Sequence, residues 1–362
     1  MDCPDLGKAA LLRFALILAV TSTLLYPADA FTPTADQNLC ATVPANADAV
    51  AACTRIIEAP SSSTLDHTVS YTFRADAARA DGNTAAAIAD YSHALELMPT
   101  LVPALSGRGI AYRNVQNYDL SLRDFDQAIA INPREAKAWS IRGLIRQRKG
   151  ETDAALNDFN EAVKLDPRNA EVLNNRSALH NFRGAYDLAL ADLNRAIKLD
   201  PRNAIFYTNR GSVFTDKGDL GRALEDFHQA LLLAPDRAIT LNNRGRVWLL
   251  KAEMSRALED LNRALLLDPA LADAWANRGA VWFAKADASR AIADFTQALK
   301  LNPQLTEVWC NRGIAHLLLD HLKEAESDCA RCRELGGALK PEAERLLREA
   351  RQKPNATVRS PN

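Results

Sequence analysis

The sequence predicts an all-α fold, a solenoid of antiparallel helix pairs stacked along the chain. Prolines recur every 34 residues without a slip, and small and bulky residues keep fixed places within that period. Self-similarity at a fixed period of this length is typical of stacked supersecondary units. The recurring prolines are Pro99, Pro133, Pro167, Pro201, Pro235, Pro269 and Pro303.

The composition of the 362 residues is that of a globular protein, with 48% hydrophobic and 25% charged residues. The formal net charge is −1, so the chain lacks the basic excess that would bind a nucleic-acid backbone. The sequence has no glycine-rich phosphate loop, and no nucleophile–base pair stands apart from the repeat pattern. We therefore expect a non-enzymatic protein without a cofactor or a bound metal.

Residues 1–30 have the layout of a secretory signal peptide. Lys8 and Arg13 precede an apolar run from Phe14 to Leu25, and Ala28–Ala30 offers a small-any-small cleavage site. We expect an exported protein, in the periplasm or else outside the cell or in a secretory lumen, without stable membrane insertion after cleavage. The alternative is an uncleaved anchor, although the apolar run is shorter than the roughly 20 residues that a bilayer requires.

Residues 31–67 form a lead-in to the repeats. Residues 31–47 are predicted to be irregular, and 48–58 to be a helix that resembles the second helix of a unit without its first. Pro60–Ser63 predicts a flexible break. Cys40 and Cys53 lie close together, and export to an oxidising compartment favours a disulfide between them over two free thiols.

Eight units occupy residues 68–339, with the recurring prolines at position 32 of each unit. Position 8 is glycine in six units, position 20 is alanine in seven, and positions 4 and 24 are mostly bulky. Positions 4, 8 and 11 share one helix face, and positions 20, 24 and 27 share a face of a second helix. The units start at Thr68, Val102, Ala136, Ala170, Ala204, Ala238, Ala272 and Thr306.

On these residues, the chain resembles the tetratricopeptide-repeat (TPR) family over residues 68–339. The resemblance implies a right-handed superhelix with a concave groove that binds a protein or an extended peptide. The eighth unit departs from the pattern, since Cys329, Cys332 and Gly337 replace its aromatic residue, alanine and proline. Residues 340–353 are predicted to be a polar capping helix, and residues 354–362 a flexible tail.

Two charges recur in all eight units, arginine at position 7 and aspartate at position 23. TPR proteins usually have an apolar residue at position 7, so an arginine there needs a carboxylate partner, and direct contact with a ligand is the alternative. We predict a structural ion pair within each unit: Arg74–Asp90, Arg108–Asp124, Arg142–Asp158, Arg176–Asp192, Arg210–Asp226, Arg244–Asp260, Arg278–Asp294 and Arg312–Asp328.

Position 6 is asparagine in five consecutive units, and in TPR proteins this position faces the concave surface. An amide both donates and accepts hydrogen bonds, as an extended peptide backbone does. The run resembles the asparagine rows of TPR segments in protein glycosyltransferases, although these amides could also merely solvate the groove. The asparagine row is Asn175, Asn209, Asn243, Asn277 and Asn311, which Asn174 and Asn242 at position 5 would widen.

TPR grooves that clamp the C-terminal carboxylate of a peptide use lysines beside such asparagines, and position 2 does not supply these lysines here. The five tryptophans, Trp139, Trp248, Trp275, Trp282 and Trp309, occupy positions 4 and 11, which favours packing over ligand stacking.

The last unit contains five residues of the types that bind metals: Cys310, His316, His321, Cys329 and Cys332. Packing is favoured for these residues too, with a disulfide among the cysteines or a metal site as alternatives.

We therefore expect an interaction scaffold that binds a peptide or protein segment in its groove. One alternative is an assembly subunit whose outer face or ends drive oligomerisation. Another is an accessory subunit that delivers substrate to a separate enzyme. The sequence identifies neither the partner, nor the pathway, nor the oligomeric state.

Overall fold

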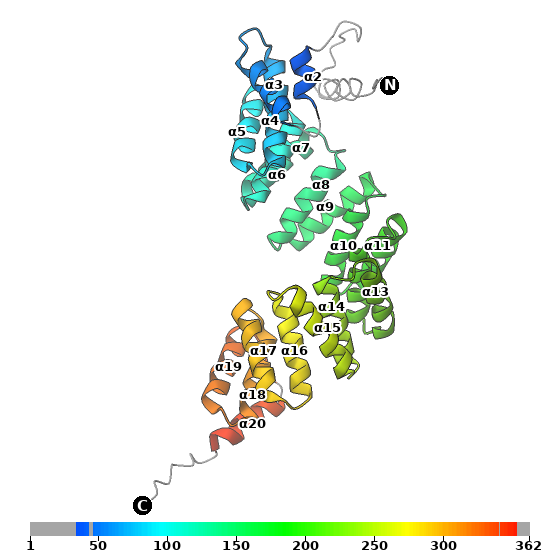
Figure 1. Cartoon of the computed structure of the whole chain (residues 1–362), viewed down its shortest axis with the longest axis vertical. Helices are drawn as coiled ribbons and strands as arrows, with labels where there is room; N and C mark the ends of the chain where they lie inside the picture. The colour runs from blue at the N-terminus through cyan, green and yellow to red at the C-terminus, as the bar shows by residue number, and fades with distance from the viewer. Residues whose placement is uncertain (1–33, 43–45, 340, 353–362) are drawn as a thin grey trace, which may run out of the picture. The chain divides into compact units, whose positions relative to one another are not determined.

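The computed structural model describes residues 34–42, 46–339 and 341–352. Within these ranges the chain forms α-helices and no β-strand, as predicted (Figure 1). The predicted signal peptide at 1–30 and the tail at 354–362 lie outside the described residues. The helices are α2 (Ala35–Cys40), α3 (Ala47–Glu58), α4 (Thr64–Ala80), α5 (Thr84–Leu97), α6 (Val102–Asn114), α7 (Tyr118–Ile131), α8 (Ala136–Arg148), α9 (Thr152–Leu165), α10 (Ala170–Phe182), α11 (Tyr186–Leu199), α12 (Ala204–Asp216), α13 (Leu220–Leu233), α14 (Ala238–Leu250), α15 (Met254–Leu267), α16 (Ala272–Ala284), α17 (Ala288–Leu301), α18 (Thr306–Leu317), α19 (Leu322–Glu334) and α20 (Pro341–Gln352).

The helices belong to two compact units, and the boundary between them in the chain falls between Arg176 and Ser177, within α10. In the first unit, α4 packs on α5, α6 on α7 and α8 on α9. In the second unit, α12 packs on α13, α14 on α15, α16 on α17 and α18 on α19. Helix bounds thus follow the 34-residue period. Among the described residues, no helix is both long enough and apolar enough to cross a membrane.

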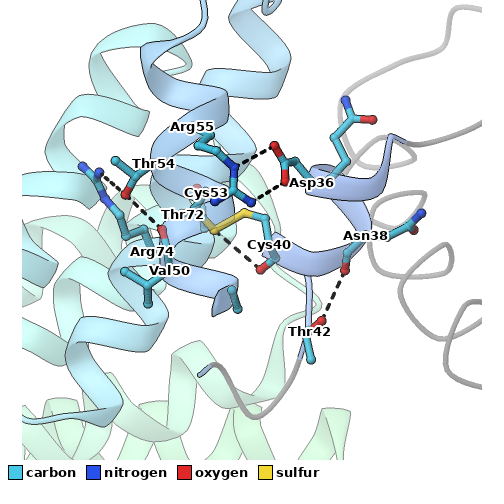
Figure 2. The surroundings of a disulfide bond; sticks show 12 residues. Asp36, Asn38, Cys40, Thr42, Val50, Cys53, Thr54, Arg55, Thr72 and Arg74 are labelled. Atoms are coloured by element: carbon cyan, nitrogen blue, oxygen red, sulfur yellow. Dashed lines mark hydrogen bonds and ion pairs between the residues drawn. A yellow bond between two sulfur atoms is a disulfide. The ribbon is translucent and has the colours of Figure 1, made fainter. Parts of the chain in front are cut away.

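The lead-in contains more structure than predicted. Residues 35–40, expected to be irregular, form α2, because Thr34 and Gln37 make a capping box that satisfies the first backbone amides. Helix α2 packs on α3 and supplies a short first helix, so the expectation of a second helix without its first was wrong. A disulfide joins Cys40 to Cys53 (Figure 2).

The first repeat helix starts earlier than the unit boundary at Thr68. Ser63 caps α4 in a second capping box, with Asp66 as its partner, so α4 begins at Thr64. At the other end, α20 matches the predicted capping helix but is not polar all round. Its Ala343 and Leu347 are buried in a cluster with residues of α18 and α19, and this apolar face covers the last helix pair.

Close packing within each helix pair depends on glycine at position 8 of the first helix. A Cβ atom at Gly109, Gly211 or Gly279 would lie 2.7–2.8 Å from the ring of the aromatic residue at position 24 in the same unit. These rings, such as Phe125 and Phe227, are fully buried. The small and bulky residues thus meet as the spacing predicted.

The turn between the two helices of each unit needs a left-handed residue at position 15. Glycine supplies it in four units, for example Gly82 and Gly218, and a residue with a side chain supplies it in the other four, for example Ala252 and Ala286. Glycine adopts this conformation without steric cost, whereas a Cβ strains it.

We expect Gly211→Ala to lower the free energy of unfolding by about 1–3 kcal/mol, because the added methyl group would overpack against Phe227. The matched control is Gly221→Ala, on the exposed side of α13, where the nearest atom is 3.8 Å from the added Cβ. That change should be neutral or stabilise the protein by up to about 0.5–1 kcal/mol. Urea unfolding followed by circular dichroism checks both, and equal effects of the two changes would contradict the packing argument.

Candidate functional site

Seven of the predicted Arg–Asp pairs lie wholly within one unit or the other, and all seven are formed. In each, the arginine Nε and Nη2 donate to the two aspartate oxygens at 2.7–3.0 Å, in the bidentate geometry that favours strong charge-assisted bonds. The aspartates are buried. Arg176 and Asp192 belong to different units, and their pairing stays a prediction.

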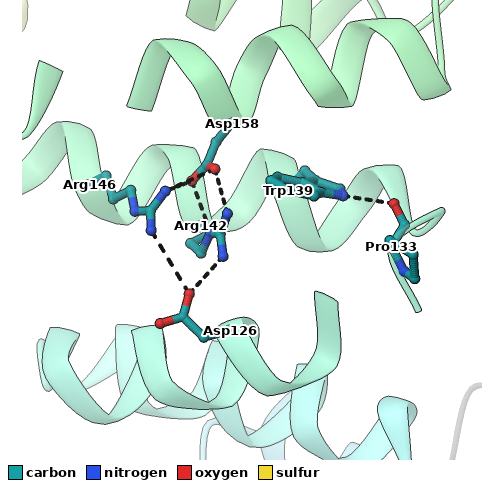
Figure 3. Close-up of polar contacts among 6 residues, drawn as sticks. All are labelled: Asp126, Pro133, Trp139, Arg142, Arg146 and Asp158. Atoms are coloured by element: carbon teal, nitrogen blue, oxygen red, sulfur yellow. Dashed lines mark hydrogen bonds and ion pairs between the residues drawn. The ribbon is translucent and has the colours of Figure 1, made fainter. Parts of the chain in front are cut away.

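The same arginines also connect neighbouring helix pairs, a role that the sequence analysis missed. Arg142 on α8 binds Asp158 on α9 and, through Nη1, donates to Asp126 on α7 at 2.7 Å (Figure 3). The partner occupies position 25 of the preceding unit, which is polar in most units, and this recurrence was the available signal. The other position-25 contacts are Arg108–Ser92, Arg176–Asn160, Arg210–Asn194, Arg278–Asn262 and Arg312–Thr296.

The tryptophans pack as expected, but they are half-buried rather than enclosed in the core. Trp139 donates its indole N–H to the carbonyl of Pro133, and the guanidinium of Arg142 lies 4.7 Å from its ring centroid. Such a contact adds a cation–π attraction to the packing. The other four tryptophans have the same contact with an arginine: Arg278 lies over Trp275, Arg312 over Trp309, Arg256 over Trp248 and Arg290 over Trp282.

The first helices of the second unit share one face, which we call the first-helix face. It contains position 6 of α12, α14, α16 and α18, occupied by Asn209, Asn243, Asn277 and Asn311, all half-buried. Consecutive first helices of this unit contact one another, so these four residues of the asparagine row lie on adjoining helices. Asn174 and Asn175 lie in the first unit, and their place in the row stays a prediction.

Asn242 does not widen the row as predicted, because it is only 5% exposed. Its Nδ2 donates to Asn243 Oδ1 at 3.1 Å, and its Oδ1 accepts from Asn277 Nδ2 at 2.9 Å. Asn243 Nδ2 in turn donates to Ser212 Oγ at 3.1 Å. This chain of hydrogen bonds joins α12, α14 and α16 and fixes the orientation of the amides of Asn243 and Asn277.

Two cavities open on the first-helix face. The first, of about 460 Å³, lies among Asn242, Asn243, Asn277, Asp273 and Thr306. The second, of about 500 Å³, is lined by Phe283, Glu307, Cys310, Asn311, Ile314, Leu318, Ala338, Ala343 and Leu346. We call the second the C-terminal cavity. Both have the size of typical ligand pockets.

Asn311 is the one amide among the described residues that line the C-terminal cavity. Within the described part of the chain its amide makes no hydrogen bond, so it retains two donors and an acceptor. The first-helix face therefore offers oriented amides beside concave apolar surface.

The cysteines of the last pair do not simply pack, as was favoured. Cys310 on α18 forms a disulfide with Cys332 on α19, whereas Cys329 is a buried free thiol whose pKa is raised by burial. Burial lowers the pKa of His316. Among the described residues, no group of histidine, cysteine and carboxylate side chains could hold a metal ion.

The fold is therefore that of a helical repeat protein. A family profile described as "Tetratricopeptide repeat" matches residues 107–170 and 208–274, and one described as "TPR repeat" matches 183–215. The matched residues are therefore tetratricopeptide repeats. A sequence comparison with curated proteins gives no match.

Solved structures share this fold at low sequence identity. A tetratricopeptide-repeat protein from Parabacteroides merdae has a TM-score of 0.60 at 17% identity, covering 69% of this chain and 98% of its own. The Cut9–Hcn1 hetero-tetramer of the APC/C has a TM-score of 0.61 at 18% identity, covering 94% and 66%. PilW, a type IV pilus biogenesis factor, has a TM-score of 0.51 at 21% identity, covering 57% and 96%. At these identities the likeness concerns the fold.

Proposed function

We propose that the protein is a non-enzymatic scaffold whose first-helix face binds an extended segment of a partner protein. The observation that carries this proposal is the row of half-buried amides on α12, α14, α16 and α18 beside two cavities. An amide side chain can pair with a backbone N–H and a backbone C=O of an extended chain at once.

The face is pre-organised for this purpose. The amides of Asn243 and Asn277 are held by hydrogen bonds to neighbouring helices, and the Arg–Asp pairs fix each first helix on its partner. Groups that are already ordered lose little conformational freedom on association, so more of the interaction energy appears as affinity.

The partner segment is expected to be internal rather than a C-terminus. Position 2 of α16 and α18 is occupied by Asp273 and Glu307, and both are exposed. Two carboxylates at this place would repel a terminal carboxylate, whereas an uncharged peptide backbone is tolerated.

The double change Asn277→Ala with Asn311→Ala tests the proposal. Peptides are first selected on the purified protein from a displayed library of random 12-residue sequences, and their affinities are measured by fluorescence anisotropy. The loss of hydrogen bonds from two amides, at roughly 0.5–1.5 kcal/mol each, should weaken binding about tenfold. Asn157→Ala, an exposed asparagine of α9 in the first unit, is the matched control. Failure to enrich any peptide, or equal affinity of both variants, would refute the proposed function.

We also propose that the protein works after export in an oxidising compartment, the periplasm. The layout of residues 1–30 supports this location, as do the disulfides Cys40–Cys53 and Cys310–Cys332, because such bonds persist outside reducing compartments. The mass of the mature chain tests export, because cleavage after Ala30 would make Phe31 the first residue.

A further inference from the structure

We propose that the segment bound by this face carries a large apolar residue within about three positions of a lysine or arginine. The apolar side chain enters the C-terminal cavity, and the cation lies against Glu307. This inference rests on the proposed function and specifies the chemistry of the partner.

The C-terminal cavity is built from three helices rather than from one exposed helix face. Phe283 comes from α16, Ile314 and Leu318 from the first helix of the last pair and its end, and Ala343 and Leu346 from α20. Leu318 is 52% exposed at the cavity, so an apolar side chain placed there would remove its surface from water.

The walls of this cavity are fixed in place. Helix α20 is held on the last pair by the buried side chains of Leu339, Ala343 and Leu347. Cys310, which also lines the cavity, is tied to α19 through its disulfide with Cys332. The cavity therefore exists before a ligand arrives, which lowers the cost of binding.

The charge beside the cavity selects a cation. Glu307 lines both cavities, and Asp273 lines the first. Neither carboxylate has a hydrogen bond or ion pair with any residue that the structure describes. Acidic residues in the first turn of a helix also interact favourably with the helix dipole, which is a structural reason for their presence. However, the first turns of α12 and α14 have Ile205 and Ile239 at this position, so the acidic pair is confined to the end of the face near the cavity.

The basic residue of the first cavity does not cancel this selection. Arg246 lines that cavity, but its Nη2 lies 3.7 Å from Asp216 Oδ1, so its charge is partly balanced by α12. No basic side chain is among the residues that line the C-terminal cavity, all of which the structure describes. Glu307 is thus the charge that an incoming side chain meets there.

The spacing of the helices sets the length of the motif. Neighbouring helices pack roughly 8–10 Å apart, and an extended chain advances about 3.3 Å per residue. A segment held by Asn311 therefore passes to Asn277 over about three residues. The apolar anchor and the cation are expected within about three positions of each other.

The experiment repeats the peptide selection with Leu318→Asp and with Glu307→Lys. The matched controls are Leu266→Asp, at an 83% exposed leucine of α15, and Glu259→Lys, at an exposed glutamate of the same helix. The wild-type protein should enrich peptides with a large apolar residue and a Lys or Arg within about three positions. Leu318→Asp should bind these peptides about tenfold more weakly, and Glu307→Lys should exchange the Lys or Arg preference for Asp or Glu. Both controls should behave as wild type.

The outcomes separate this inference from the proposed function. In one outcome, the selected peptides bind the Asn277→Ala, Asn311→Ala protein more weakly but bind Leu318→Asp and Glu307→Lys as tightly as wild type. That outcome would support the binding face and overturn the roles assigned to the cavity and to Glu307. Selected peptides without the apolar–basic pair would overturn it as well. If no peptide is enriched, the proposed function fails and this inference fails with it. Melting curves show that each variant is folded before it is scored.

Discussion

Replacing Asp158 with alanine is expected to lower the free energy of unfolding by about 3–5 kcal/mol, because it removes the buried carboxylate that pairs with Arg142 and leaves only the exposed Asp126 as the partner of this arginine. Asp158 is 1% exposed and accepts hydrogen bonds from both Arg142 and Arg146 (Figure 3). Burial acts to lower the pKa of Arg142, but its bonds to Asp158 and Asp126 outweigh burial and raise it. An arginine guanidinium is not deprotonated in proteins, so Arg142 cannot escape the loss of Asp158 by becoming neutral. Urea unfolding followed by circular dichroism measures the effect.

Asp119→Ala is the matched control. Its side chain is 79% exposed and pairs with Lys149 at 2.7 Å, so the loss should be far smaller than that for Asp158→Ala. A similar small loss in both variants would show that the Arg–Asp pairs contribute little, and that arginine at position 7 is present for another reason. Arg142→Ala complements the test, since it removes the cation instead and should also destabilise the protein strongly.

Regular features of this chain could be predicted because one physical requirement is repeated in each unit. Gly211 and Phe227 must meet if the two helices are to approach closely, and the same spacing recurs in most units. An arginine such as Arg210 at a position facing the partner helix needs a carboxylate, and Asp226 is the one that recurs with it. The pairing follows from local spacing and charge alone.

Features that depend on a single place in the tertiary structure could not be predicted in this way. Cys310, Cys329 and Cys332 allow three pairings, and only the packing of α18 on α19 selects Cys310 with Cys332. Asn242 and Asn243 are neighbours of the same residue type, yet contacts between helices bury the first and leave the second half-buried. In each case the deciding contact comes from another helix.

The C-terminal cavity also illustrates this limit of sequence reasoning. Its apolar wall joins Phe283 on α16 to Leu346 on α20, helices separated in the chain by three others, and α20 had been expected to be polar. The periodic pattern ends before α20, so the repeat gives no register for that helix. The apolar positions Ala343 and Leu347, four residues apart, were the available signal for its buried face.

Removing the disulfide at the start of the array is expected to release α2. In the double variant Cys40→Ala, Cys53→Ala the local stability of this end should fall by about 3 kcal/mol, the loop-closure contribution of a bond across a short loop. Helix α2 has six residues, too few to persist alone, so it depends on contacts with α3 and α4. Besides the disulfide, these include Arg55 bound to Asp36 at 3.0 Å (Figure 2), and Gln37 bound to Asp66 at 2.7 Å.

The loss should be local, because in a repeat protein each unit is stabilised mainly by its nearest neighbours. Hydrogen exchange measured by mass spectrometry should show faster exchange in α2 and α3 and unchanged exchange in α6 and α7. A reductant provides the control: it should reproduce the change at this end in the wild type and add nothing there in the double variant. If residues 35–58 stay fully protected in the variant, then the hydrogen bonds and packing of α2 hold this end without the disulfide. Faster exchange throughout the first unit would instead mean that the lead-in stabilises the pairs beyond it.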